Sequence, residues 1–127
     1  MGAASTGSVL DEVARERARQ DAKWGEQNHP DGSGPRVSLM SPILGAPSDK
    51  WGDRVGVHLA LMRELRDNAV ATTDQRAVTG ELTWRDILLE EVFEAFAEED
   101  PARLRAELIQ VAAVATQWVE AIDRRSK

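Results

Sequence analysis

Hydrophobic residues recur at helical spacing along most of the chain, and a central stretch interrupts this pattern. Residues 8–24 and the residues from 53 onward show the spacing, whereas residues 25–50 do not. Four of the five prolines lie in the interrupting stretch, namely Pro30, Pro35, Pro42 and Pro47. We therefore predict one helix before and several helices after a long Pro/Gly loop. Loops of this length usually cover or form binding sites, or are disordered.

The pattern after residue 53 predicts three more helices. An apolar stripe indicates a helix over residues 53–70, formed by Val55, Leu59, Met62 and Leu65. Residues 71–80 fit a frayed extension of that helix or a short turn. Thr83 with Asp86 resembles a capping box and predicts a helix over residues 83–99. Asp100 before Pro101 predicts the start of a last helix, over residues 101–124, which folds back on its predecessor as an antiparallel hairpin.

These elements predict an all-α protein with four helices in a bundle. A chain of 127 residues favours a single domain, which we place at residues 9–125 after a flexible tail over residues 1–8. The sequence has no cysteine, which excludes disulfides and thiolate metal sites. No apolar run approaches the roughly 18–20 residues of a membrane span, and the first residues lack a targeting pattern. We therefore expect a cytoplasmic protein that does not bind membranes.

The net charge of −6 argues against binding to nucleic acid polymers, which need clustered Lys and Arg. The predicted helix over residues 83–99 concentrates the negative charge, because no Lys or Arg lies between Asp86 and Ala102. Its glutamates share an arc of roughly 100° on an otherwise apolar helix. They are Glu90, Glu91, Glu94 and Glu98. Like charges four residues apart cost about 0.2–0.5 kcal/mol per pair, so this strip does not serve helix stability.

The last helix adds a carboxylate and an amide to an otherwise apolar stripe. Glu107 and Gln110 lie beside Val111, Val114 and Trp118. In an antiparallel hairpin, Glu107 reaches a similar height to Glu94, and Gln110 a similar height to Glu91. Burying unpaired carboxylates costs several kcal/mol, and a hard cation removes that cost. Because oxygen ligands suit Mg²⁺ and no His or Cys is near, the pattern predicts a Mg²⁺ or Mn²⁺ site.

These residues resemble the motifs of a known family. The segments EEVFE at residues 90–94 and ELIQ at residues 107–110 are similar to the EExxE and ExxD motifs of the MazG-like all-α nucleoside triphosphate pyrophosphohydrolases. The resemblance covers residues 83–123. It implies a four-helix core in homodimers or homotetramers, and Mg²⁺-dependent cleavage of an NTP or dNTP to the monophosphate and pyrophosphate.

The resemblance also implies roles for individual residues. Glu91, Glu94 and Glu107 would bind the metal, and Glu90 would be a further ligand or the base that orients water. Glu91 or Glu94 would also act in catalysis by activating the attacking water. Gln110 stands where the family motif has aspartate. A neutral amide ligates through one oxygen and is no base, so this position would bind the metal more weakly than the family's aspartate.

A second candidate site is the segment RQDAKWGEQNHPDG at residues 19–32. Arg19 and Lys23 can hold phosphates, Trp24 can stack on a base, and Gln27 and Asn28 can hydrogen-bond to a base edge. Similar segments occur near the start of some MazG-like proteins. In the alternative interpretation Trp24 packs in the core, Lys23 is solvated and the amides cap the helix. We expect the remaining large or titratable side chains to be structural or on the surface, namely His29, Trp51, His58, Trp84 and Trp118.

Two other functions fit the same residues. The chain can be a noncatalytic nucleotide-binding or regulatory module in which Gln110 has weakened the chemistry. It can also be a helical interaction domain whose acidic strip meets a basic partner. In the simplest alternative, the strip is solvated and Glu98 pairs with Arg103 across the turn.

Overall fold

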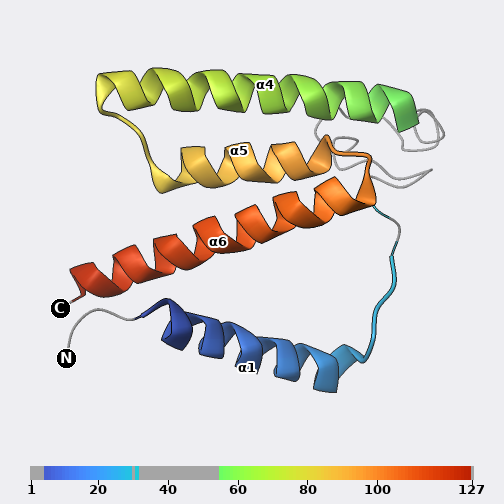
Figure 1. Ribbon diagram of the computed structural model, residues 1–127, viewed down its shortest axis with the longest axis vertical. Coiled ribbons are helices and arrows are strands. Elements are labelled where there is room, and N and C mark those ends of the chain that lie inside the picture. The colour runs from blue at the N-terminus through green and yellow to red at the C-terminus, as the bar shows by residue number, and fades with distance from the viewer. Residues whose placement is uncertain (1–4, 30, 32–54, 127) are drawn as a thin grey trace. The chain divides into compact units, whose positions relative to one another are not determined.

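The computed structural model describes residues 5–29, 31 and 55–126, apart from the side chains of residues 55–60. These residues form four helices and no strand, which confirms the predicted all-α class. The helices are α1 (Thr6–Trp24), α4 (Val55–Thr79), α5 (Trp84–Phe96) and α6 (Pro101–Arg125), as Figure 1 shows. None of these helices combines the length and the apolar character that crossing a membrane requires.

The chain divides into two compact units. The first unit contains residues 1–29 and 112–127, and the second contains residues 30–111, so that α6 contributes to both. The single domain over residues 9–125 stays a prediction. Most of the predicted Pro/Gly loop, together with Trp51 and the side chains of Val55, His58 and Leu59, lies outside the described residues.

In the first unit, α1 is closed at both ends by local hydrogen bonds. It begins at Thr6, two residues earlier than predicted, because the Ser5 hydroxyl caps it by accepting the Ser8 N–H at 3.1 Å. It ends at Trp24 as predicted. Gly25 has φ 69°, and its N–H donates to the Asp21 carbonyl at 2.8 Å, so the next residue leaves the helical path.

The second helix of the chain extends beyond residue 70. It continues to Thr79, so of the two interpretations of residues 71–80 the extension is confirmed and the short turn is wrong. Gly80 has φ 81°, and the Glu81 N–H donates to the Arg76 carbonyl at 2.9 Å. This is the bonding pattern of a Schellman motif, in which a glycine just past the last residue ends the helix. Residues 71–79 are therefore helical rather than a turn.

The predicted starts of the last two helices are confirmed. The Thr83 hydroxyl accepts the Asp86 N–H at 3.2 Å, and the Asp86 carboxylate accepts the Thr83 N–H at 3.1 Å, which completes the capping box of α5. Asp100 caps α6 by accepting the Arg103 N–H at 2.9 Å. The predicted end of α5 at residue 99 was wrong. The helix stops at Phe96, and Glu98 turns back so that its carboxylate accepts the Asp100 N–H at 3.0 Å.

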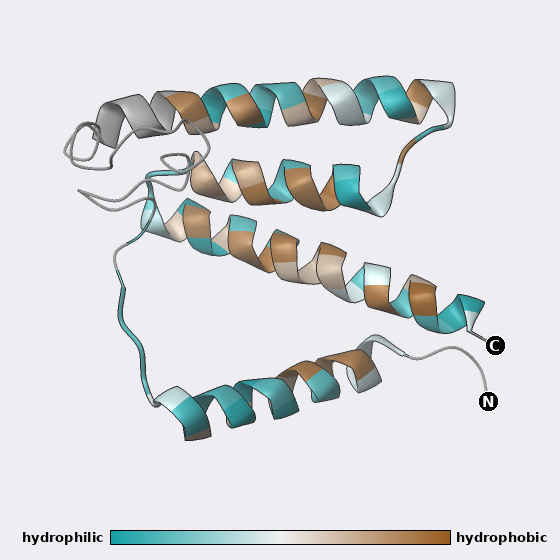
Figure 2. Cartoon of the chain, turned by 180° about the vertical axis from the view of Figure 1, so that it is seen from behind, coloured by the Kyte–Doolittle hydropathy of each residue, from teal (hydrophilic) through white to brown (hydrophobic). Residues whose placement is uncertain are grey.

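The second unit is organised by the contact between α4 and α5, which lie side by side and antiparallel (Figure 1). Figure 2 shows apolar and polar residues alternating along both helices, as expected where one face of each is buried. The buried side chains of this unit are small except for Met62, which is 2% exposed; the others are Ala69, Asp86, Ala95 and Ala97. The Phe93 and Phe96 rings meet edge to face at 6.2 Å.

Asp86 links the start of α5 to α4. Its carboxylate lies 3.7 Å from the Arg76 guanidinium, and its carbonyl accepts the Thr73 hydroxyl at 3.3 Å. Burial raises the pKa of Asp86, but hydrogen bonds from Thr83 and the nearby arginine charges outweigh it and leave the pKa below its ordinary value. The capping carboxylate thus stays ionised although it is buried.

Replacing Gly80 should destabilise the protein through the backbone alone. A Cβ at Gly80 meets nothing within 4 Å, but φ of 81° strains any residue with a side chain. We expect Gly80→Ala to lower the free energy of unfolding by roughly 1–2 kcal/mol, measured by urea denaturation. The matched control is Gly7→Ala in α1, where the backbone is helical and the new methyl is tolerated, so stability should hold or rise slightly. Equal losses in the two variants would contradict the assignment of Gly80 as the helix stop.

Candidate metal centre

Three glutamates of the second unit converge at the turn between α5 and α6. Glu91 and Glu94 come from α5, three residues apart and therefore on one face of the helix, and Glu107 comes from the second turn of α6. One carboxylate oxygen from each lies within 4.8 Å of the others, and all three residues are half-buried. We call these residues the carboxylate triad.

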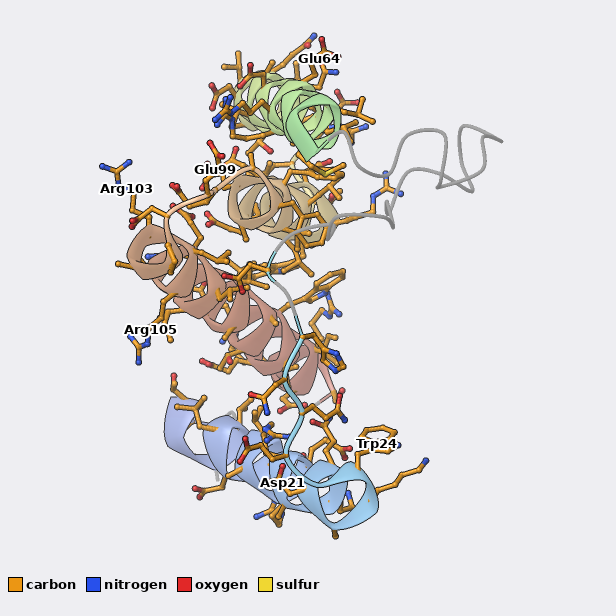
Figure 3. All side chains as sticks on the ribbon, turned by 90° about the vertical axis from the view of Figure 1, so that its right-hand side faces the viewer. Asp21, Trp24, Glu64, Glu99, Arg103 and Arg105 are labelled. Carbon is orange, nitrogen blue, oxygen red and sulfur yellow. The ribbon has the colours of Figure 1, made fainter. Side chains whose placement is uncertain are left out.

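No Lys or Arg in the described part of the chain pairs with the carboxylate triad. Among the described side chains, the ion pairs of Lys and Arg all involve other acidic residues. Arg63 of α4 pairs with Glu99 in the turn at 3.1 Å, and Figure 3 shows Arg103 and Arg105 extending from α6 toward solvent. The pairing of Glu98 with Arg103 that we considered from the sequence is not formed. The triad therefore keeps its negative charges uncompensated.

The pKa values of Glu94 and Glu91 are raised by burial and by the repulsion among these carboxylates. Burial, the Glu91 charge, and both a hydrogen bond and the charge of Glu107 raise the pKa of Glu94 from an ordinary 4.5 to about 7, with a further contribution from Glu90. Burial and the charges of Glu107 and Glu90 also raise the pKa of Glu91. Such shifts mark carboxylates whose charged form is disfavoured because it has no positive partner.

The Glu90 carboxylate faces α4. Burial and the charge of Asp74 on α4 raise its pKa, and a hydrogen bond with Thr73 of α4 partly offsets the rise. It therefore lies at the contact between α4 and α5, one residue before the triad. The sequence analysis did not single out Thr73 and Asp74, because it left residues 71–80 open as an extension of the helix or a short turn.

Gln110, the remaining predicted ligand, and Glu98 are not part of the triad. Gln110 follows Glu107 by three residues on α6 and is exposed. Glu98, which the sequence placed on the same acidic strip, is engaged by the Asp100 N–H instead. The structure therefore brings together three of the four predicted metal ligands as a compact cluster.

The predicted substrate-binding residues lie in the first unit, and all of them are exposed: Arg19, Lys23, Trp24, Gln27 and Asn28. Trp24 is 56% exposed, so the alternative that it packs in the core is wrong. The Lys23 ammonium lies 4.9 Å from the centre of the Trp24 ring, in a cation–π contact.

The other members of this segment are tied to acidic or amide neighbours. The Arg19 Nε–H donates to Glu16 at 3.0 Å. Asn28 donates to the Glu26 carboxylate at 2.9 Å, and the Gln27 side-chain oxygen lies 3.0 Å from His29 Nε2. Arg19 is therefore not free to hold a phosphate without giving up its carboxylate partner.

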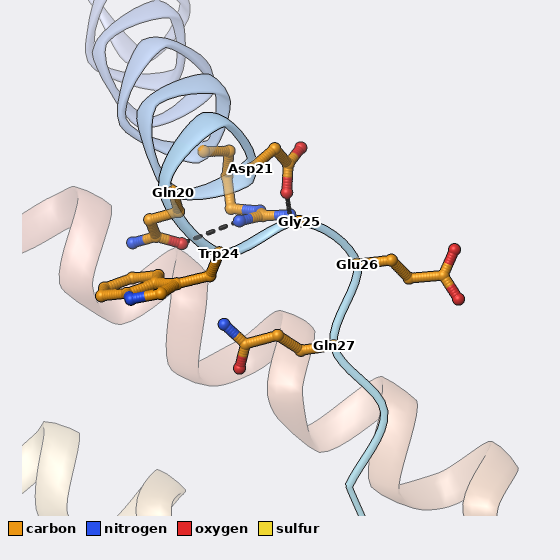
Figure 4. A pocket seen from close by; sticks show the side chains of 7 residues that line it. Gln20, Asp21, Trp24, Gly25, Glu26 and Gln27 are labelled. Atoms are coloured by element: carbon orange, nitrogen blue, oxygen red, sulfur yellow. Dashed lines mark hydrogen bonds and ion pairs between the residues drawn. The ribbon is translucent and has the colours of Figure 1, made fainter.

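Trp24 borders an open hollow of about 750 Å³ at the end of α1 (Figure 4). We call it the Trp24 hollow; its side chains are Arg17, Gln20, Asp21, Trp24, Glu26 and Gln27. Sequence reasoning missed Arg17, Asp21 and Glu26. Helical spacing could have found the first two, because they precede Trp24 by seven and three residues and so share its face of α1.

Comparison with known proteins finds no relative of this chain. The chain matches no protein-family model, no curated protein and no solved structure. The functional argument therefore starts from two features of the described residues: the carboxylate triad in the second unit and the Trp24 hollow in the first.

The raised pKa values predict how stability depends on pH without metal. Since the folded state binds the Glu94 proton more tightly than the unfolded chain, the unfolded state gains relative stability as pH rises from 4.5 to about 7. We therefore expect the melting temperature in EDTA to fall across this window and then to level off. Asp86, whose pKa is lowered, affects stability only at more acidic pH.

The control is Glu94→Gln, which removes one charge from the triad. At water-like screening a pair of charges at this separation costs roughly 1 kcal/mol, so the variant should be more stable than the parent at pH 7.5 by about that amount. Its melting temperature should also vary less between pH 5 and pH 7.5. The same fall with pH in both proteins would show that the triad is not its source.

Proposed function

We propose that this protein is a Mg²⁺-dependent nucleoside triphosphate pyrophosphohydrolase of the MazG-like kind, which converts an NTP or dNTP to the monophosphate and pyrophosphate. The carboxylate triad carries the proposal. Its members occupy the positions at which the motif resemblance implies metal ligands, and no described Lys or Arg compensates their charge.

The donor set fits a hard divalent cation. All three groups offer carboxylate oxygens, which Mg²⁺ and Mn²⁺ prefer. One oxygen of each carboxylate lies within 4.8 Å of the others, so the three groups would be close enough to hold a single ion. Water and phosphate oxygens would complete its coordination. Gln110, three residues along α6, would be a neutral fourth donor.

The bound ion would supply neutralisation of the triphosphate and a lower pKa for a coordinated water. The reaction itself is hydrolysis. The oxygen of water attacks the α-phosphorus, the bond from that phosphorus to the bridging oxygen breaks, and pyrophosphate leaves with that oxygen. Glu91, Glu94 and Glu107 would hold the ion.

Glu90 is suited to accept the proton of the attacking water. It lies next to the triad along α5, and burial together with Asp74 raises its pKa, which makes its carboxylate a stronger base than an exposed one. The hydrogen bond with Thr73 would fix its orientation. In this arrangement α4 supplies the groups that position the base, while α5 and α6 supply the metal ligands.

Assembly into homodimers or homotetramers belongs to the same proposal. Leu108 and Ile109 follow Glu107 on α6 and are 50% and 56% exposed. Two large apolar side chains at adjacent exposed positions next to a polar site favour burial against another copy. The proposed ligand is a nucleoside triphosphate, with no role for a nucleic acid polymer or a membrane.

The first test is pyrophosphate release from a panel of ribo- and deoxyribonucleoside triphosphates with Mg²⁺ or Mn²⁺. We expect at least one triphosphate to yield monophosphate and pyrophosphate in equal amounts. Glu94→Gln should reduce the rate at least about 100-fold, because it removes a metal-binding charge. The matched control is Glu64→Gln on α4, an exposed glutamate of the same unit, which should keep the parent rate.

Two results would overturn the proposal. One is the absence of turnover for every triphosphate with either metal. The other is turnover that Glu94→Gln and Glu64→Gln leave equally intact, since the triad would then have no part in the reaction. Release of phosphate instead of pyrophosphate would place cleavage at another bond.

Gln110 gives a separate prediction in the opposite direction. Replacing it with aspartate restores the charge that the family motif carries beside the ligands. We expect Gln110→Asp to lower the Mg²⁺ concentration for half-maximal activity several-fold, and to lower apo stability at neutral pH by a few tenths of a kcal/mol through added repulsion. An unchanged Mg²⁺ requirement would exclude Gln110 from the metal's surroundings.

A further inference from the structure

The Trp24 hollow combines an exposed aromatic ring with a fixed set of polar groups. Trp24 is the last residue of α1, and more than half of its surface is exposed. Trp24 lines the hollow, and the Lys23 ammonium, which lies 4.9 Å from the centre of the Trp24 ring, does not. An exposed indole beside a hollow offers a flat surface on which a planar ring can stack.

The polar groups beside this ring are held by Arg17. Its guanidinium donates to the Gln20 side-chain oxygen and to one Asp21 carboxylate oxygen, both at 2.8 Å (Figure 4). Both members of the Arg17–Asp21 pair are more than half exposed, so the pair orients side chains more than it stabilises the fold. The Gln20 amide nitrogen and the second Asp21 oxygen are left for a ligand.

The charge of the lining selects against phosphate. Arg17 is the single cation among the lining side chains, whereas Asp21 and Glu26 are two carboxylates, so the lining carries a net charge of −1. Asn28 engages only one oxygen of Glu26. The hollow therefore presents two carboxylate oxygens that can accept hydrogen bonds from a neutral ligand, and it repels an anion.

We propose that the Trp24 hollow binds a nucleobase that carries an exocyclic amino group, stacked on Trp24 and donating to Asp21 or Glu26. Cytosine, adenine and guanine present such a group, and carboxylates accept from it. Uracil and thymine present a carbonyl oxygen at the corresponding edge, which a carboxylate repels. The inference rests on the proposed function for the nature of the ligand, because a nucleotide substrate carries such a base.

The test uses nucleosides, which have no phosphate and need no metal. In EDTA, the indole N–H signals of the ¹⁵N-labelled full-length protein are followed by NMR, and Trp24→Phe identifies the Trp24 signal. Cytidine and uridine are the matched ligands, because they differ at the amino-bearing edge. We expect cytidine and adenosine to shift the Trp24 signal saturably, with dissociation constants at least about fivefold below those of uridine and thymidine.

Two variants test the role of the carboxylates. In the double variant Asp21→Asn with Glu26→Gln, the preference for cytidine over uridine should disappear while stacking on Trp24 remains. Glu12→Gln, an exposed glutamate on α1 outside the hollow, should keep the preference. Equal affinities for cytidine and uridine in the parent protein would overturn the proposal, and so would the lack of a saturable shift with any nucleoside.

The result of this experiment does not depend on the result of the test of the proposed function. Pyrophosphate release that depends on Glu94, without nucleoside binding at Trp24, would leave the proposed function standing and remove the base selectivity. Amino-selective nucleoside binding without any pyrophosphate release would leave the hollow as a nucleobase site and remove the catalytic assignment.

Discussion

Repulsion among three carboxylates is the constraint around which the second unit is built. Glu91, Glu94 and Glu107 lie together although burial and mutual charge oppose it, and the pKa of Glu94 rises to about 7 as a result. The position of Glu94 two residues before the end of α5 adds to the cost, because the last turn of a helix disfavours negative charge. Leucine or lysine would stabilise the helix better at this position, and the proposed Mg²⁺ would offset the cost of glutamate.

Capping hydrogen bonds at the helix starts position the triad. The capping box at Thr83 and Asp86 fixes where α5 begins, and Asp100 fixes where α6 begins. Between these points the helical period determines which glutamates share a face. These features depend on neighbours within four residues, which is why the sequence was sufficient to predict them. The approach of Glu107 to Glu94 also needs the reversal of the chain between α5 and α6, which Asp100 and Pro101 signalled.

Features that depend on distant residues could not be read in the same way. The direction of Glu90 toward Thr73 and Asp74 arises from the packing of α4 on α5, and no local pattern encodes it. The end of α4 had a local signal in Gly80, but the polar residues before it hid the helical pattern. Around Trp24 the sequence predicted the aromatic ring, and helical spacing could have added Asp21, whereas the place of Glu26 beyond the end of α1 became apparent only with the side chains in place.

The short, capped connection between α4 and α5 has a consequence for the order of folding. The Schellman motif at Gly80 and the capping box at Thr83 leave few residues free between the two helices, so closing this pair costs little loop entropy. Contacts between segments so near in sequence form early. The pair contains no member of the triad from α6, so closing it does not bring the three carboxylates together. The electrostatic cost therefore falls on the docking of α6 against α5, and the proposed divalent cation would favour that step rather than the formation of the helix pair.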